Sequence, residues 1–198
     1  RSAQQYPNSE HRYARTFTQK PGYVSGAVTD RIWASYNGRL YGRAYDALLP
    51  FIDGNEALLK LARGELPGVE TGEDLRFYIE ENLIRRIGQM YCDGSIQGNL
   101  GYHHLGMAWL LMALGDLESG RFPDGMDLLE FIYHRNSGPV ATFPNLLMRD
   151  GSSHESTGYN SSRLNMVEAL DVLERFFKDQ GQSIPRDRPA TGTRDSKC

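Results

Sequence analysis

The apolar positions along the chain repeat with the 3.6-residue period of an α-helix, and no segment alternates every second residue as a half-buried strand would. Turn residues and helix caps separate the periodic segments. The pattern predicts helices over residues 29–49, 53–61, 71–91, 102–114, 124–134 and 161–179. Because helix follows helix throughout, the predicted fold class is all-α, built from helical hairpins.

The apolar positions also predict which face of each helix is buried. In the first helix they are Ile32, Trp33, Tyr36, Leu40, Tyr41, Ala44, Tyr45, Leu48 and Leu49, and in the last they are Leu164, Val167, Leu170, Leu173, Phe176 and Phe177. The helix over 71–91 is expected to begin at a capping box formed by Thr71 and Asp74. Its solvent-facing residues are expected to be Arg76, Glu80, Glu81, Arg85 and Arg86. The helix over 102–114 is apolar on almost all sides, which predicts burial on most sides.

The pattern divides the 198 residues into an irregular arm over 1–28, one helical domain over 29–180 and a flexible tail or linker over 181–198. The net charge of −3 argues against general nucleic-acid binding, which needs a basic face. No apolar run approaches the roughly 20 residues of a membrane span. The two cysteines, Cys92 and Cys198, are expected to be unrelated thiols.

A first polar segment, residues 93–104, is rich in glycine and leads into the apolar helix. Asn99 and His103 are four residues apart, which is one turn if the helix already includes both. His104 projects about 100° away from His103 on an α-helix. One histidine is therefore expected to face a cleft while the other packs inward. The alternative is an ordinary helix start with two solvated or hydrogen-bonded histidines.

A second polar segment, residues 150–160, precedes the last predicted helix. It contains Glu155 and Tyr159 among small hydroxyl residues and glycines, and Arg149 and Arg163 flank it. A nearby guanidinium favours the phenolate and would lower the pKa of Tyr159 from about 10. The alternative is an extended helix cap in which Tyr159 only packs.

Other kinds of site have weaker support. Adjacent histidines on one helix do not readily bind the same ion, and no Cys or carboxylate stands at ligand spacing, so no metal site is predicted. The chain has neither the Gly-x-Ser-x-Gly motif of a serine hydrolase nor a dinucleotide-binding glycine pattern after a strand. Asp93 and Asp150 are candidates for the acid of a glycoside hydrolase, although Asp before Gly is also a common turn.

The two polar segments together resemble motifs of the heparinase II/III-like polysaccharide lyases and the related alginate lyases. The matching residues are Gln97-Gly-Asn99-Leu-Gly-Tyr-His103-His104 and Asp150-Gly-Ser-Ser-His-Glu155-Ser-Thr-Gly-Tyr159-Asn160. The resemblance covers about residues 70–180. It implies an incomplete (α/α) toroid, of which this chain holds part, and a missing β-sandwich domain or chain that carries a further catalytic histidine. The family places Asn directly beside His, whereas three residues separate Asn99 from His103 here.

The resemblance also implies an activity, which is β-elimination on an acidic polysaccharide or oligosaccharide that contains uronic acid. Tyr159 would transfer protons, and Asn99, His103 and His104 would neutralise the substrate carboxylate. Substrate binding would fall to Glu155, Arg149, Arg163, Gln97 and Tyr102. The reaction needs no cofactor, and the family implies a periplasmic or secreted protein. Three alternatives remain: a glycoside hydrolase on an (α/α) toroid, a catalytically incomplete carbohydrate-binding domain, and a helical interaction module.

Overall fold

The computed structural model describes residues 36–92, 101–134 and 161–183 of the chain. The predicted arm over 1–28 lies outside these residues, as does most of the predicted tail over 181–198. Within the described residues every regular element is helical and there is no strand, which confirms the predicted all-α class.

The helices follow the predicted order closely. They are α3 (Tyr36–Leu48), the short 3₁₀ turn η2 (Leu49–Phe51), α4 (Glu56–Glu65), α5 (Gly72–Ile79), the π-helical segment η3 (Glu80–Ile84), α6 (Arg85–Cys92), α7 (Tyr102–Leu114), α8 (Gly125–His134) and α10 (Ser161–Asp179). The predicted helices over 102–114 and 161–179 match α7 and α10 at both ends, whereas the start of the first predicted helix lies outside the described residues.

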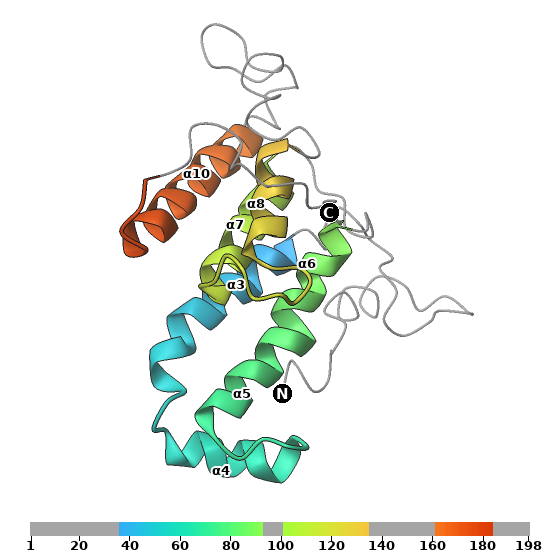
Figure 1. The fold of residues 1–198 in the computed structure, drawn as a ribbon, viewed down its shortest axis with the longest axis vertical. Coiled ribbons are helices and arrows are strands. Elements are labelled where there is room, and N and C mark those ends of the chain that lie inside the picture. The colour runs from blue at the N-terminus through green and yellow to red at the C-terminus, as the bar shows by residue number, and fades with distance from the viewer. Residues whose placement is uncertain (1–35, 93–100, 135–160, 184–198) are drawn as a thin grey trace, which may run out of the picture.

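Helix α7 is the centre of the fold, in contact with α3, α8 and α10 (Figure 1). Eleven of its thirteen residues are buried, which confirms the burial predicted from its all-round apolar sequence. Gly115 ends the helix in the left-handed conformation, with φ of 69°. A left-handed residue at this place is a common helix stop and is easiest for glycine.

Helix α3 comes closest to α7 at two glycines, which are not part of its predicted apolar stripe. A Cβ added to Gly38 would lie 2.9 Å from the Cα of Gly106, and one added to Gly42 would lie 2.7 Å from the carbonyl carbon of Trp109. The predicted inner residues Leu40 and Leu48 are instead more than half exposed. The stripe prediction for α3 was therefore right for Tyr45, which is buried, and wrong for Leu40 and Leu48. It missed the two glycines, because a hydrophobicity pattern does not count the small residues that contact between two backbones needs.

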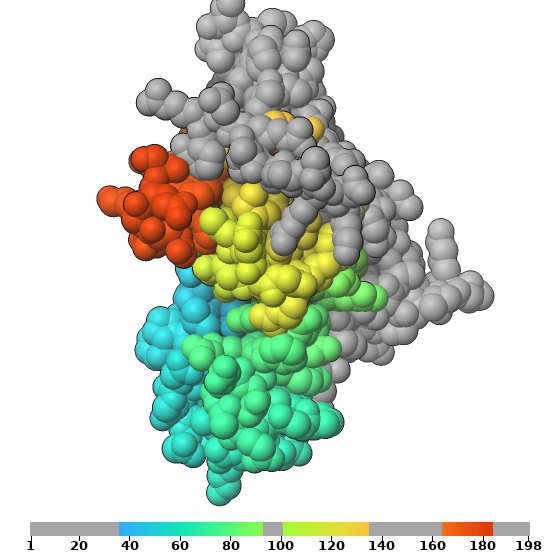
Figure 2. Space-filling view, viewed as in Figure 1, coloured from blue at the N-terminus to red at the C-terminus, as the bar shows by residue number. Residues whose placement is uncertain are grey.

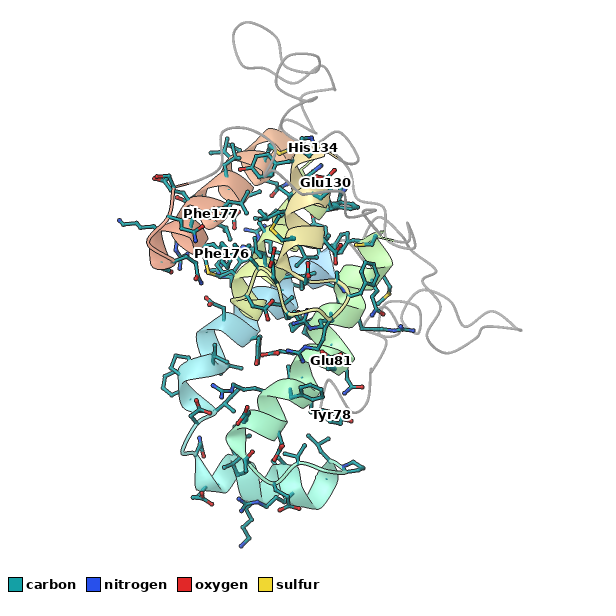
Figure 3. All side chains as sticks on the ribbon, viewed as in Figure 1. Tyr78, Glu81, Glu130, His134, Phe176 and Phe177 are labelled. Atoms are coloured by element: carbon teal, nitrogen blue, oxygen red, sulfur yellow. The ribbon has the colours of Figure 1, made fainter. Side chains whose placement is uncertain are left out.

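Helix α10 covers another side of α7. Phe176 and Phe177 are both 2% exposed and pack edge to face, with ring centroids 5.3 Å apart (Figure 3). Leu173 is also buried, as predicted, but Leu164 and Val167 are exposed. The predicted stripe therefore holds only for the second half of the helix, whereas the first half packs through other residues, Asn165, Met166 and Ala169.

Helices α5, η3 and α6 form one rod, seen in green in Figure 1. The predicted capping box is confirmed: Asp74 N–H donates to Thr71 Oγ1 at 3.1 Å, and Thr71 N–H donates to Asp74 Oδ2 at 2.8 Å. The π segment was not predicted. In it Arg85 N–H donates to the Glu80 carbonyl five residues earlier, and this wider turn interrupts the 3.6-residue period.

The π segment is followed directly by Arg85, whose predicted exposure was wrong. Its side chain is 0% exposed, whereas the adjacent Arg86 faces solvent as expected. A helical wheel drawn with a single period across the whole rod cannot account for this, because the angle per residue changes at η3. Cys92, the last residue of α6, is disulfide-bonded, which corrects the expectation of two unrelated thiols.

The half of the domain formed by α3, α4 and α5 is more open than the half around α7. A cavity of about 510 Å³ lies between these three helices, with mainly apolar side chains such as Leu48, Phe51, Leu58 and Leu83 around it. In Figure 2 these helices form the blue-to-green lower lobe, below the yellow and orange lobe of α7, α8 and α10. Among the described residues, no helix combines the length and the apolar character needed to cross a bilayer.

Candidate functional site

The sequence predicted nine site residues, and the structure describes the side chains of three of them, Tyr102, His103 and His104. Arg163 belongs to α10, but its side chain is outside the description. Asn99, Gln97, Arg149, Glu155 and Tyr159 lie outside the described residues, as do the alternative acids Asp93 and Asp150. The predicted meeting of the two polar segments therefore remains a prediction.

The start of α7 is where the first polar segment becomes helix. Gly101 is the N-cap residue, with φ of 84°, and it has no side chain to accept a hydrogen bond from the first turn. Its carbonyl accepts the Leu105 N–H at 3.0 Å, so the helix is regular from its first turn. The early N–H groups and the partial positive charge of a helix N-terminus favour an anion at such a place.

His103 and His104 lie in this first turn, and both are buried, with exposures of 5% and 0%. Their ring centroids are 4.5 Å apart, and both rings contact Phe131 of α8, with centroid distances of 6.0 and 6.4 Å. The prediction that one histidine faces a cleft while the other packs inward was therefore wrong as to the first, because α8 covers both rings. The same contacts hold the rings rigidly, which a preorganised site requires.

Tyr102 lies at the edge of this cluster. It is partly buried, and its ring centroid is 5.0 Å from that of Tyr36, the first residue of α3. The start of α3 and the start of α7 therefore meet through two tyrosines. Each has an apolar ring and a polar hydroxyl, which is typical of residues that line wet binding surfaces.

Tyr91 of α6 belongs to the same cluster, although the sequence analysis did not select it. It is fully buried, and its ring contacts Phe131 with centroids 6.3 Å apart. Burial raises the pKa of the Tyr91 phenol, against a smaller lowering by a backbone hydrogen bond with Gly38. The phenol is therefore neutral at ordinary pH and does not act as a base. In the sequence Tyr91 is one more apolar residue near a helix end, so no local signal distinguished it.

A second group of ionisable residues lies where η3 and α6 meet the segment that joins α7 to α8. The Arg85 guanidinium makes ion pairs with Glu81 at 3.0 Å and Asp116 at 3.3 Å, and it donates to the Pro123 carbonyl at 2.6 Å. Arg121 in turn pairs with Glu81 at 2.9 Å. Glu81, labelled in Figure 3, thus connects a buried arginine to a half-exposed one.

Glu80 completes this group and is the carboxyl most disfavoured as an anion. Tyr45 of α3 donates its O–H to Glu80 at 3.0 Å, and Arg121 lies 3.9 Å from the other carboxylate oxygen. Burial raises the pKa of Glu80 and outweighs the lowering by Tyr45 and the two arginines. Burial and the Glu80 charge likewise raise the pKa of Tyr45. A π segment beside a carboxyl with a raised pKa is a combination found at functional sites. Here the ion pairs already join three parts of the fold, so a structural role accounts for it.

The described residues hold no group of three or more His, Cys, Asp and Glu side chains placed to bind a metal ion. Comparison of the chain with protein-family models, with curated proteins and with solved structures finds no match. The functional argument therefore rests on the residues themselves.

Proposed function

We propose that the chain is the toroid portion of a polysaccharide lyase that cleaves a uronic-acid polymer by β-elimination. The observation that carries the proposal is the start of α7. There the first of two lyase-like sequence motifs ends in two buried histidines in the first turn of a helix, and the N-cap of that helix is a glycine, which has no side chain to cap it. Catalysis of this reaction depends on fixed donors for a carboxylate, which this arrangement can supply.

The reaction begins with removal of the proton at C5 of the uronate. This proton is weakly acidic while the neighbouring carboxylate is fully charged, so the enzyme must neutralise that charge as the enolate develops. The helix dipole, the early N–H groups of α7 and the amide donor of Asn99 would do so, while the two buried histidines would hold the first turn of α7 in place. The electron pair then forms the C4–C5 double bond, the C4–O4 bond breaks, and the leaving oxygen takes a proton.

Tyr159 is the proposed proton-transfer residue, as base when it is ionised and as acid to O4 when it is neutral. Arg149 and Arg163 would lower its pKa and hold acidic groups of the substrate through paired N–H donors. Glu155 would orient a histidine or an arginine, and Gln97 and Tyr102 would contact the sugar. Buried Tyr91 would hold the histidines in place through Phe131.

The helical hairpins around α7 would form part of an incomplete (α/α) toroid. A β-sandwich domain or separate chain would complete the site, and the protein would act in the periplasm or outside the cell. The chemistry requires no cofactor.

The decisive experiment incubates the protein, alone and in its full-length form, with a set of uronate polymers and follows the ultraviolet absorbance of the new C4–C5 double bond. Tyr159→Phe should abolish turnover while leaving substrate binding intact. The matched control is Tyr78→Phe, the same change on the rod (Figure 3), which should leave turnover unaltered. Absence of unsaturated product from every polymer would refute the proposal, and saturated products would favour the glycoside hydrolase instead.

A further inference from the structure

Two arginines from different helices lie against the same tryptophan. The Cζ atoms of Arg43 on α3 and Arg175 on α10 are each 5.8 Å from the ring centroid of Trp109 on α7. The two guanidinium carbons are therefore no further apart than twice that distance. Trp109 is 6% exposed, whereas both arginines are exposed residues. The buried tryptophan thus lies in contact with two solvent-accessible cations.

The neighbouring contact between the same two helices is organised differently. Arg39 donates to both carboxylate oxygens of Glu168, at 2.8 and 3.1 Å, so this arginine of α3 is matched by an acid of α10. Arg43 follows Arg39 by one helical turn, and Arg175 follows Glu168 by about two turns. Arg39 and Glu168 thus pair opposite charges from the two helices, whereas Arg43 and Arg175 are both positively charged.

Neither arginine has an acidic partner within the part of the chain that the structure describes. Asp46, Asp171 and Glu174 stand near them in sequence, but none forms an ion pair with Arg43 or Arg175. The buried indole N–H of Trp109 likewise has no hydrogen-bond acceptor among the described residues. The described residues around Trp109 therefore bring together two cations without an acidic side chain to pair with either.

A cation over an aromatic ring is attracted to its face, but this contact leaves the N–H edges of a guanidinium available. Those edges match an oxyanion, which accepts two parallel hydrogen bonds from one arginine. A tetrahedral group with three or more terminal oxygens can accept from two arginines at once, whereas a carboxylate has only two oxygens. Two guanidiniums held over one ring therefore favour the tetrahedral group.

We propose that Arg43, Arg175 and Trp109 form a binding site for a tetrahedral oxyanion, carried by a ligand as a phosphate or sulfate monoester. The site is built from α3, α7 and α10, and it includes none of the residues assigned to the lyase reaction. It therefore stands or falls independently of that activity.

Fluorescence of Trp109 tests the proposal directly. The chain has two tryptophans, so a Trp33→Phe background leaves Trp109 as the sole indole reporter. Titration with inorganic phosphate or sulfate should change its emission saturably. Arg43→Gln and Arg175→Gln should each weaken binding about tenfold or more, since a hydrogen-bonded charged contact is lost. The matched control is Lys60→Gln on α4, an exposed residue whose substitution removes the same charge and should leave binding within about twofold.

Further arms identify the group that binds and guard against loss of folding. Methyl phosphate and methyl sulfate at constant ionic strength show which monoester the site prefers, and acetate should bind much more weakly than either. Arg43→Lys and Arg175→Lys keep the positive charge but lose the paired N–H donors of the guanidinium. They should therefore bind better than the Gln variants but less well than the parent. Equal binding of acetate, absence of saturation, or Gln variants that bind as well as Lys60→Gln would each overturn the proposal.

Discussion

The start of α7 and the junction of η3 with α6 both bury ionisable side chains, but they do so by opposite means. At α7 the two histidines pack among aromatic rings, with Phe131 in contact with both. At η3 and α6 the fully buried Arg85 is surrounded by carboxylates and carbonyls from η3 and from the segment that joins α7 to α8. The first region depends on packing and the second on matched charge.

The difference decides what each region can do. A buried ion pair has its hydrogen-bonding capacity occupied by the protein, and its energetic gain is largely offset by desolvation. Such a group is suited to fixing one geometry. The histidine rings at α7 are instead positioned by contact with each other and with Phe131. The cluster at α7 is therefore the better candidate for chemistry, and the η3 group the better candidate for structure.

The largest expected effect is on the packed region. Phe131→Ala should lower the free energy of unfolding by about 3–5 kcal/mol, because a 2% exposed ring that supports Tyr91 and both histidines is lost. Urea denaturation followed by circular dichroism measures this. Phe77→Ala, at a residue 54% exposed, is the matched control and should cost less than about 1 kcal/mol. Equal losses would show that the α7 region is not held by packing.

Arg85→Met should lower stability by a similar or slightly smaller amount, about 3–5 kcal/mol. It leaves Glu81 and Asp116 without their central cation while their surroundings remain partly buried. Arg86→Met is the same change one residue later on the exposed face, and it should stay within about 0.5 kcal/mol. The two denaturation midpoints compare them directly. If Arg85→Met is as stable as the parent, the ion pairs contribute nothing to stability beyond the packing of the side chain.

Gly42→Ala should cost about 1–3 kcal/mol, because its new Cβ would lie 2.7 Å from the Trp109 backbone and force α3 away from α7. Gly64→Ala is the matched control within α4, where a Cβ meets nothing within 4 Å. That change should instead stabilise by about 0.5–1 kcal/mol through the higher helix propensity of alanine. Thermal melts of the two variants should therefore move in opposite directions.

The smallest effects concern pH and should have opposite signs at the start of the rod and in its middle. Hydrogen bonds from Thr71 lower the pKa of Asp74 below 3.8, so its contribution to stability is present above that pH and is lost as the pH falls through the folded value. Burial raises the pKa of Glu80 above 4.5, so stability is instead lost as the pH rises through its folded value. In melts from about pH 2 to about pH 8, which bracket the ordinary pKa of a carboxyl group, Asp74→Asn should remove the loss of stability toward low pH. Glu80→Gln should remove the loss of stability toward high pH.

The sequence predicted the helices well, because helix order, the Thr71 capping box and the burial of α7 follow from periodicity and local turn chemistry. It failed where tertiary contact overrides periodicity. Gly38 and Gly42 carry no hydrophobic signal, yet they form the inner face of α3. Arg85 is charged and so was predicted to face solvent. It is buried because residues far along the chain, Asp116 and Pro123 among them, supply its partners. Tyr91 is a site candidate only through its contact with Phe131, which comes from a distant helix.

The central position of α7 has a consequence for how the protein is made. Its covering helices come from both directions along the chain: α3 ends at Leu48, well before α7 begins at Tyr102, and α10 begins only at Ser161. When α7 has left the ribosome during synthesis, α10 has not. Until α10 is made, the face of α7 that α10 covers in the folded protein stays exposed. Contacts between segments far apart in the sequence slow folding, and the apolar surface that they cover is exposed until they form. Chains truncated before residue 161 should therefore aggregate or remain bound to chaperones.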